Sequence, residues 1–194
     1  MYTPQYFEIT NKNEQYSFIA ANGFGQLISS SGGRPYSTHL PFLLSDDKTK
    51  LLAHLAIQNP QVEDIVDQQV LVTLQGIHGY ISPSWYQSSG VPTWNYQAAH
   101  IYGSCETFTD INKLEDLVNK LTAKYESSLP APWQPDYNPK MLTAIIGIEI
   151  SISEIQCKYK LSQNKSQQDQ QQVIDQLISN GSIDLSTAMQ LVKK

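Results

Sequence analysis

The chain contains very little arginine. Arg34 is the only arginine among 194 residues, the remaining basic residues are lysines, and the formal net charge is −5 at pH 7. Arginine is the side chain that most often makes bidentate contacts to phosphate and guanine. The composition therefore argues against a broad nucleic-acid-binding surface, and leaves only a local patch at Lys158, Lys160 and Lys165 as a candidate for DNA contact.

Long hydrophobic runs and cysteines are scarce as well. No apolar stretch approaches the ~20 residues of a membrane-spanning helix, and residues 1–8 show no basic region followed by an apolar one. These absences predict a soluble protein with no signal peptide and no membrane partner. Cys105 and Cys157 lie far apart and lack the spacing of metal ligands, so we expect two reduced thiols in a cytoplasmic protein.

Catalytic motifs of high specificity are also missing. The sequence has no Gly-rich phosphate loop, no His-Glu-x-x-His and no Gly-x-Ser-x-Gly. The four histidines, His39, His54, His78 and His100, fall in or next to predicted strands, but no cysteine or carboxylate joins them at ligand spacing. We therefore predict no metal site and name no catalytic residue; each histidine can also be a hydrogen-bonded, partly buried side chain.

The most distinctive stretch that the chain does contain is residues 75–96. It holds two Trp, three Tyr, one His, two Pro and three Gly. Rigid rings beside residues that restrict the backbone are typical of a shaped surface. Strand-like residues flank it on both sides, so we expect it to join two strands and to hold rings over a cleft. The alternative is a large loop whose rings only plug one end of a barrel.

Hydrophobic periodicity predicts mainly β-structure. Strands are expected at 24–30, 35–44, 51–57, 69–75, 93–108 and 143–155, with a hairpin turn at 31–34. Helices are expected from Thr10 or Asn11 to about Asn22, around 61–66, and from Thr109 or Asp110 to Tyr125. Because helices do not alternate with the strands, this order predicts an α+β fold with an antiparallel sheet closed into a barrel.

The composition changes after Ser162. Residues 163–172 include six glutamines, and apolar residues at helical spacing predict one short helix up to Asn180 and another that starts at Ser182 or Asp184. Two short helices can form a helix-turn-helix, but a tail packed on its own barrel or on a partner subunit is favoured. We therefore predict a barrel domain at 1–162 and a Gln-rich linker with a helical tail at 163–194.

A planar, hydrogen-bonding ligand accounts for the polar and aromatic residues together. Donors and acceptors would come from Ser37, Thr38, His39, His54, Gln75, His78, Tyr80, Ser82 and Asn95, and flat walls from Trp85, Trp94 and Tyr96. A flavin ring needs hydrogen bonds at its edges and apolar contacts at its faces, and so it fits this set. Other aromatic ligands fit the same residues.

Six sequence blocks, in order along the chain, carry a family resemblance. They are Met1-Tyr-x-Pro4, Ser37-Thr-His-Leu-Pro-Phe-Leu-Leu44, His54-Leu-Ala-x-x-Asn-Pro60, Gln75-Gly-x-His-Gly-Tyr-Ile-Ser-Pro-Ser-Trp-Tyr86, Val91-Pro-Thr-Trp-Asn-Tyr96 and Lys158-Tyr-Lys-Leu-Ser-Gln-Asn164. These blocks resemble the PaiB family, described as FMN-binding negative transcriptional regulators or as negative regulators of protease synthesis and sporulation. The resemblance implies a split β-barrel related to flavin reductases and pyridoxamine-phosphate oxidases, usually a homodimer with FMN between its subunits.

The resemblance also implies a set of FMN-binding positions. The ring would lie along Ser37–Leu40 and His54–Ala56, and Val91–Tyr96 of a partner subunit would cover it. Similar chains often carry an arginine after His-x-Ala, where this chain has Ile57, so the phosphate would have to meet Lys158, Lys160 or Arg34 instead. The candidate cofactor-binding residues are Ser37, Thr38, His39, Leu40, His54, Ala56, Gln58, Gln75, His78, Trp85, Trp94, Asn95, Tyr96, Lys158 and Lys160.

Three functional interpretations follow. The first is a PaiB-like, FMN-binding negative transcriptional regulator that acts as a homodimer. The second is a flavin-dependent oxidoreductase, which the implied fold permits although no residue demands redox chemistry. The third is a dimeric protein that holds haem or another planar ligand and does not bind DNA. We expect the first.

Overall fold

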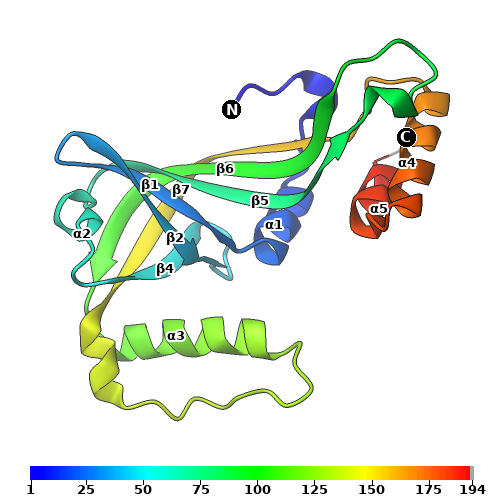
Figure 1. Ribbon diagram of the computed structural model, residues 1–194. Coiled ribbons are helices and arrows are strands. Elements are labelled where there is room, and N and C mark those ends of the chain that lie inside the picture. Colours follow the sequence, from blue (N-terminus) through cyan, green and yellow to red (C-terminus); the bar gives the residue numbers. More distant parts are fainter. Residues whose placement is uncertain (193–194) are drawn as a thin grey trace. The chain divides into compact units, whose positions relative to one another are not determined.

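The computed structural model describes residues 1–192 (Figure 1). Its strands are β1 (Phe24–Ser31), β2 (Arg34–Pro41), β3 (Leu43–Leu44), β4 (Lys50–Ala56), β5 (Gln69–Ile81), β6 (Thr93–Phe108) and β7 (Ile145–Lys160). Its α-helices are α1 (Lys12–Ala21), α2 (Gln61–Asp64), α3 (Ile111–Glu126), α4 (Gln167–Ser179) and α5 (Ile183–Leu191). Three 3-10 helices complete the described chain: η1 (Gln5–Phe7), η2 (Pro83–Trp85) and η3 (Pro139–Ala144). This set of strands and helices, in this order, confirms the predicted α+β class. None of the helices in residues 1–192 is long and apolar enough to cross a membrane.

The seven strands form one sheet in the order β2-β1-β5-β6-β7-β4-β3. The predicted hairpin is confirmed, because β1 and β2 pair antiparallel from Phe24 opposite Pro41 to Ser31 opposite Arg34. Gly32 and Gly33 form its turn with φ of 57° and 77°, a conformation that two-residue hairpin turns require and that glycine adopts at little cost. β2 also approaches β4 near the opposite end of the order, so the sheet curls toward a barrel.

Two predicted strands are too short. We placed the end of one strand at residue 75, but β5 continues to Ile81, and β7 continues to Lys160 instead of ending at 155. The part of β5 that we did not predict, Gly76 to Ile81, includes two glycines and few β-branched side chains. Its composition therefore did not indicate a strand. Part of the aromatic stretch is therefore strand and not loop.

The chain divides into two compact units, each assembled from separate stretches. The terminal unit comprises residues 1–18, 75–99 and the chain from Gln156 onward, and the barrel unit comprises residues 19–74 and 100–155. The predicted domain division at residue 162 stays a prediction.

The barrel unit is filled by side chains that alternate along its strands. Leu51, Ala53 and Leu55 of β4 are at most 1% exposed, and they face a core that also contains Ile148 and Ile150 of β7. β4 pairs antiparallel with β7, with Ala53 opposite Ile148 and His54 opposite Gly147. This register follows from the apolar alternation that the sequence shows, and it turns His54 away from the core residues on either side of it.

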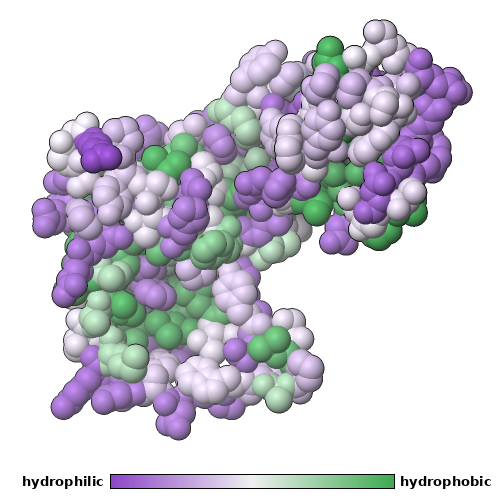
Figure 2. All heavy atoms as spheres, viewed as in Figure 1, coloured by the Kyte–Doolittle hydropathy of each residue, from purple (hydrophilic) through white to green (hydrophobic). Residues whose placement is uncertain are grey.

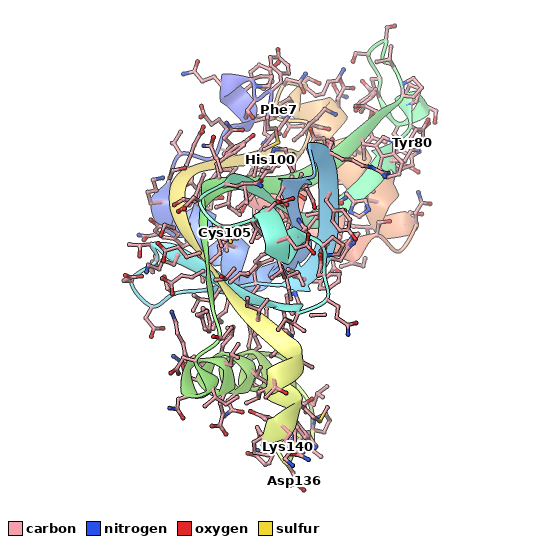
Figure 3. All side chains as sticks on the ribbon, turned by 90° about the vertical axis from the view of Figure 1, so that its left-hand side faces the viewer. Phe7, Tyr80, His100, Cys105, Asp136 and Lys140 are labelled. Atoms are coloured by element: carbon pink, nitrogen blue, oxygen red, sulfur yellow. The ribbon has the colours of Figure 1, made fainter. Side chains whose placement is uncertain are left out.

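α3 is the amphipathic helix that the sequence predicts. The Asp110 side chain caps its first turn by accepting a hydrogen bond from the Lys113 backbone N–H at 2.8 Å. Leu114, Leu117 and Leu121 recur at helical spacing and are buried. After α3 an extended segment runs back alongside the helix to η3 and β7 (Figure 1), and Asp136 and Lys140 mark this return segment in Figure 3.

The terminal unit ends in two helices that pack against each other. The Ser166 side chain caps α4 by accepting from the Asp169 N–H at 3.1 Å. The Asp169 carboxylate in turn accepts hydrogen bonds from the Gln87 N–H, the Ser88 N–H and the Ser88 hydroxyl at 2.9, 3.3 and 2.7 Å. One carboxylate thus fixes the loop after η2 to the start of α4, inside the stretch that we predicted as a linker or helix start.

Candidate functional site

A cleft of about 350 Å³ opens in the barrel unit, where the end of β2 and the outer face of β4 meet α3. It is lined by Pro41, His54, Val118, Leu121, Thr122, Tyr125, Glu126 and Trp133. Figure 2 shows apolar side chains gathered on this part of the surface, between the barrel strands and α3. A concave and mostly apolar cleft with a few polar groups is typical of a small-molecule site.

His54 is the polar group of the cleft that lacks an internal partner. Its ring is half-buried, and Nδ1 is fully buried with no hydrogen-bond partner within residues 1–192. Burial lowers the pKa of His54 below its usual 6.5, so the imidazole is neutral at pH 7. A buried polar atom without a partner costs about 1–3 kcal/mol. His54 thus lines the cleft with a neutral ring whose buried Nδ1 has no partner within residues 1–192.

Flat side chains from α3 and from the segment after it form the walls. Tyr125 and Trp133 are 44% and 49% exposed, while Leu121 between the helix and the barrel is 5% exposed. The Glu126 carboxylate accepts a hydrogen bond from the Trp133 N–H at 2.7 Å and so fixes the backbone that carries the indole. The cleft therefore offers two aromatic faces beside one neutral imidazole.

β2 carries four of the predicted residues on alternating sides. Ser37 and His39 are exposed, whereas Thr38 is half-buried and Leu40 is 8% exposed. His39 has a partner on the adjacent strand, because its Nε2 lies 3.0 Å from the Gln26 Nε2. The β2 residues thus split between the outer surface and the interior.

Thr38 belongs to a polar network inside the barrel unit. Its hydroxyl donates to the Gln61 Oε1 and accepts from the Asn59 Nδ2 at 3.0 Å. Gln61 is completely buried, and its Nε2 donates to the Ser29 hydroxyl at 2.7 Å and to the Leu27 carbonyl at 3.4 Å. These bonds hold the turn after β4 to the β1–β2 hairpin.

The end of β4 carries no charge. Ala56, Ile57 and Gln58 are all exposed there, and Ile57 is 49% exposed. Of the predicted residues in the barrel unit, the structure therefore places only His54 in the cleft.

The terminal unit gathers several predicted rings on β5 and β6. The His78 and Trp94 ring centroids are 6.3 Å apart, and the Tyr80 and Trp94 centroids are 6.1 Å apart. Tyr80 and Trp94 are 46% and 54% exposed. Gln75 is exposed and Trp85 is half-buried. Trp94 thus lies between two of the predicted rings, and their role in binding a ligand stays a prediction.

Asn95 lies inside the terminal unit and is completely buried. Its Nδ2 donates to the Ser162 hydroxyl at 3.0 Å and to the Met189 Sδ at 3.4 Å, and its Oδ1 accepts from the same hydroxyl. The polar atoms of Asn95 therefore have protein partners that join β6 to the C-terminal region.

The two predicted lysines also have protein partners. The Lys158 ammonium donates to the Tyr2 carbonyl at 3.0 Å and lies over the Tyr96 ring, 5.3 Å from its centroid. The Lys160 ammonium donates to the Thr93 hydroxyl at 2.6 Å and to the Trp94 carbonyl. Burial, with the nearby charges of Lys158 and Lys165, lowers the pKa of Lys160.

Sequence reasoning missed the α3 side of the cleft. Tyr125 ends the apolar stripe of that helix, and Trp133 follows within a proline-rich stretch, but no local pattern shows that either faces β4. No disulfide joins Cys105 and Cys157: both thiols are free and buried, and burial raises the pKa of each to about 12. Figure 3 shows Cys105 among the strands of the barrel unit.

Comparison with known proteins gives the family. A family model described as "Putative FMN-binding domain" matches residues 1–154. Protease synthase and sporulation protein PAI 2 of Bacillus subtilis is 41% identical over 186 residues, which cover 91% of this chain and 89% of the relative.

Two solved structures share the fold at low identity. The FAD and haem binding protein from Mycobacterium smegmatis has a TM-score of 0.66 at 15% identity, over 90% of this chain and 80% of its own. The flavocytochrome Anf3 from Azotobacter vinelandii also has a TM-score of 0.66 at 15% identity, over 81% and 72% of the two chains. These similarities confirm the split-barrel fold, and the match over residues 1–154 shows that the chain belongs to the FMN-binding PaiB family.

Proposed function

We propose that the cleft of the barrel unit binds the ring of a flavin, FMN or a related one, and that His54 holds its edge. The observation that carries the proposal is the buried, unpartnered Nδ1 of a neutral imidazole at the cleft wall. A flavin ring presents donors and acceptors along its edge, and a neutral imidazole nitrogen can pair with either kind. Binding would give that nitrogen the partner that the chain itself does not supply.

The other lining residues fit the ring. Tyr125 and Trp133 supply flat faces, and Leu121 supplies an apolar floor that keeps water away from the imidazole. The cleft volume of about 350 Å³ lies in the range of roughly 300–1,000 Å³ that is usual for small-molecule sites. A bound flavin supplies electron or hydride transfer. The residues of the cleft bind it, orient it and exclude water.

We propose that the protein is a homodimer and that Val91–Tyr96 of a second copy covers the flavin. Val91 and Trp94 are 72% and 54% exposed, so their apolar side chains are accessible to a second copy. Sedimentation of the purified protein with and without FMN tests this step. A monomer in both samples would refute it.

We further propose that flavin binding serves regulation in the cytoplasm, as a negative transcriptional regulator. The name of the Bacillus subtilis relative supports a role connected with protease synthesis and sporulation. The net charge of −5 and the single arginine favour weak or partner-assisted DNA contact over direct, tight binding. Fluorescence anisotropy with a promoter fragment at several salt concentrations tests direct contact, and the absence of any salt-sensitive binding would remove that version.

A flavin titration tests the cleft itself. Quenching of FMN fluorescence is followed with the wild-type protein, with Trp133→Ala, and with Tyr137→Ala as the matched control. Tyr137 lies on the same return segment but outside the cleft, with its hydroxyl bonded to the Asn119 Oδ1 at 2.9 Å. We expect Trp133→Ala to weaken binding about fivefold, since a stacked aromatic ring contributes on the order of 1 kcal/mol beyond its buried area, while Tyr137→Ala binds normally. Equal affinity for both variants and the wild type would place the flavin elsewhere.

A further inference from the structure

We infer that the cleft recognises the uncharged ring system of its ligand and not a phosphate, so that riboflavin binds about as tightly as FMN. This inference rests on the proposed function and specifies the ligand class of the same site. It follows from the charges that line the cleft and from the groups at both ends of β4.

The lining holds no positive charge. Among its residues His54, Tyr125 and Glu126 can ionise; burial keeps His54 neutral at pH 7 and raises the pKa of Tyr125 above its usual 10, so only Glu126 carries a charge. Glu126 adds a negative charge at the cleft, where its carboxylate is fixed by the Trp133 N–H. Among the lining residues a phosphate dianion would meet one carboxylate and no cation, and like charges at short range repel.

The nearest lysine of α3 turns its ammonium group to other partners. Lys124 Nζ lies 3.5 Å from the Phe42 carbonyl oxygen and over the Tyr125 ring, 5.4 Å from the centroid. Burial lowers the pKa of Lys124, which shows that its ammonium group is partly removed from water. Reaching a phosphate in the cleft would require Lys124 to give up both contacts.

β4 offers no cation to the cleft at either end. After His54 it continues into Ala56, Ile57 and Gln58, which are exposed and uncharged. At the other end, the Lys50 ammonium forms a salt bridge with Glu149, which Lys113 also contacts at 2.9 Å. A phosphate that extended from the ring along this strand would therefore remain in solvent.

The cleft should therefore discriminate little between FMN and riboflavin, and the ratio of their dissociation constants measures this. A site that makes one charge-assisted contact to phosphate would prefer FMN over riboflavin by about 10- to 150-fold. For this cleft we expect the two dissociation constants to agree within about threefold and to change little between 20 and 200 mM salt, because the apolar ring contacts that remain are not screened.

The test compares riboflavin and FMN by fluorescence titration in the wild-type protein, in Thr122→Lys and in Glu126→Gln. Thr122 lies in the cleft, so a lysine there should raise the ratio of FMN affinity to riboflavin affinity by about 10-fold or more and make FMN binding salt-dependent. Glu126→Gln removes the carboxylate charge while keeping an acceptor for the Trp133 N–H, and should raise the ratio of FMN affinity to riboflavin affinity by about two- to fivefold. Melting curves followed by circular dichroism establish that both variants are folded.

The outcomes separate this inference from the proposal on which it rests. A wild-type protein that binds FMN more than 10-fold tighter than riboflavin overturns the inference and leaves flavin binding intact. A protein that binds neither flavin overturns the proposed function, and the inference with it. Similar affinities in the wild type, with a preference for FMN created by Thr122→Lys, support both.

Discussion

Replacing His54 by leucine should make the protein more stable and a poorer flavin binder. Leucine has nearly the volume of histidine, suits a strand interior and brings no polar atom into the cleft. The imidazole Nδ1 is fully buried without a partner, and such a group costs about 1–3 kcal/mol. Because the rest of the ring is only half-buried, the low end of that range applies, and we expect a gain of about 1 kcal/mol in the free energy of unfolding.

The same substitution removes the hydrogen bond that we assign to the flavin edge. A net hydrogen bond contributes about 0.5–1.5 kcal/mol, so FMN and riboflavin should both bind about 2- to 12-fold more weakly. Urea denaturation of the apo protein measures the first effect, and flavin fluorescence titration measures the second. Opposite signs in the two experiments are expected of a residue kept for binding at a cost in stability.

His39→Leu is the matched control. It makes the same chemical change at an exposed imidazole that already has Gln26 as a partner and that lies outside the cleft. We expect no gain in stability and unchanged flavin affinity. If His54→Leu destabilises the protein, the unpartnered nitrogen is not a cost, and if His39→Leu weakens flavin binding more than His54→Leu does, the ring lies on the outer face of β2.

Three further predictions concern pH, the C-terminal helices and the buried network. Burial lowers the pKa of His54 and of His100, so below about pH 6.5 the unfolded chain binds more protons than the folded chain. The free energy of unfolding should therefore decrease as the pH is lowered from 8 to 5. Denaturation of the wild type and of His54→Leu over this range should show a shallower decrease in the variant. Asp169→Asn, compared with Asp175→Asn, should make the loop after η2 susceptible to limited proteolysis, because only Asp169 accepts its three hydrogen bonds, and equal cleavage of the two variants would refute this role. Gln61→Leu should lower the unfolding free energy by about 2–3 kcal/mol, since it removes a partner from the buried Ser29 hydroxyl and from the half-buried Thr38 hydroxyl. A melting temperature within about 2 °C of the wild type would contradict this prediction.

The elements whose pattern is local were predictable. β6 occupies residues 93–108 as predicted, because apolar and aromatic residues recur along its whole length, and α3 follows from a capping aspartate and a leucine stripe. The extension of β5 to Ile81 was not predictable, because Gly76 and Gly79 interrupt the alternation that identifies a strand. Pairing with neighbouring strands, which a single stretch does not encode, decides its length.

The candidate site was predictable only on one side. His54 stands out as a histidine in an apolar strand, but its partners on α3 lie more than 60 residues further along the chain, and only the folded packing brings Leu121 beside it. Thr38 illustrates a different limit. The sequence suggested that its hydroxyl could bind a ligand. Side chains alternate between the two faces of β2, however, so the Thr38 hydroxyl bonds to Gln61 and His39 lies on the outer surface.

The most direct test of the flavin cleft is an NMR measurement on protein labelled with ¹⁵N-histidine. The Nδ1 resonance of His54, assigned by its loss in His54→Leu, is followed while FMN is added. We predict that this resonance shifts in proportion to the bound fraction while that of His39 stays in place. Saturation with FMN that leaves the His54 Nδ1 resonance unmoved would contradict flavin binding in this cleft.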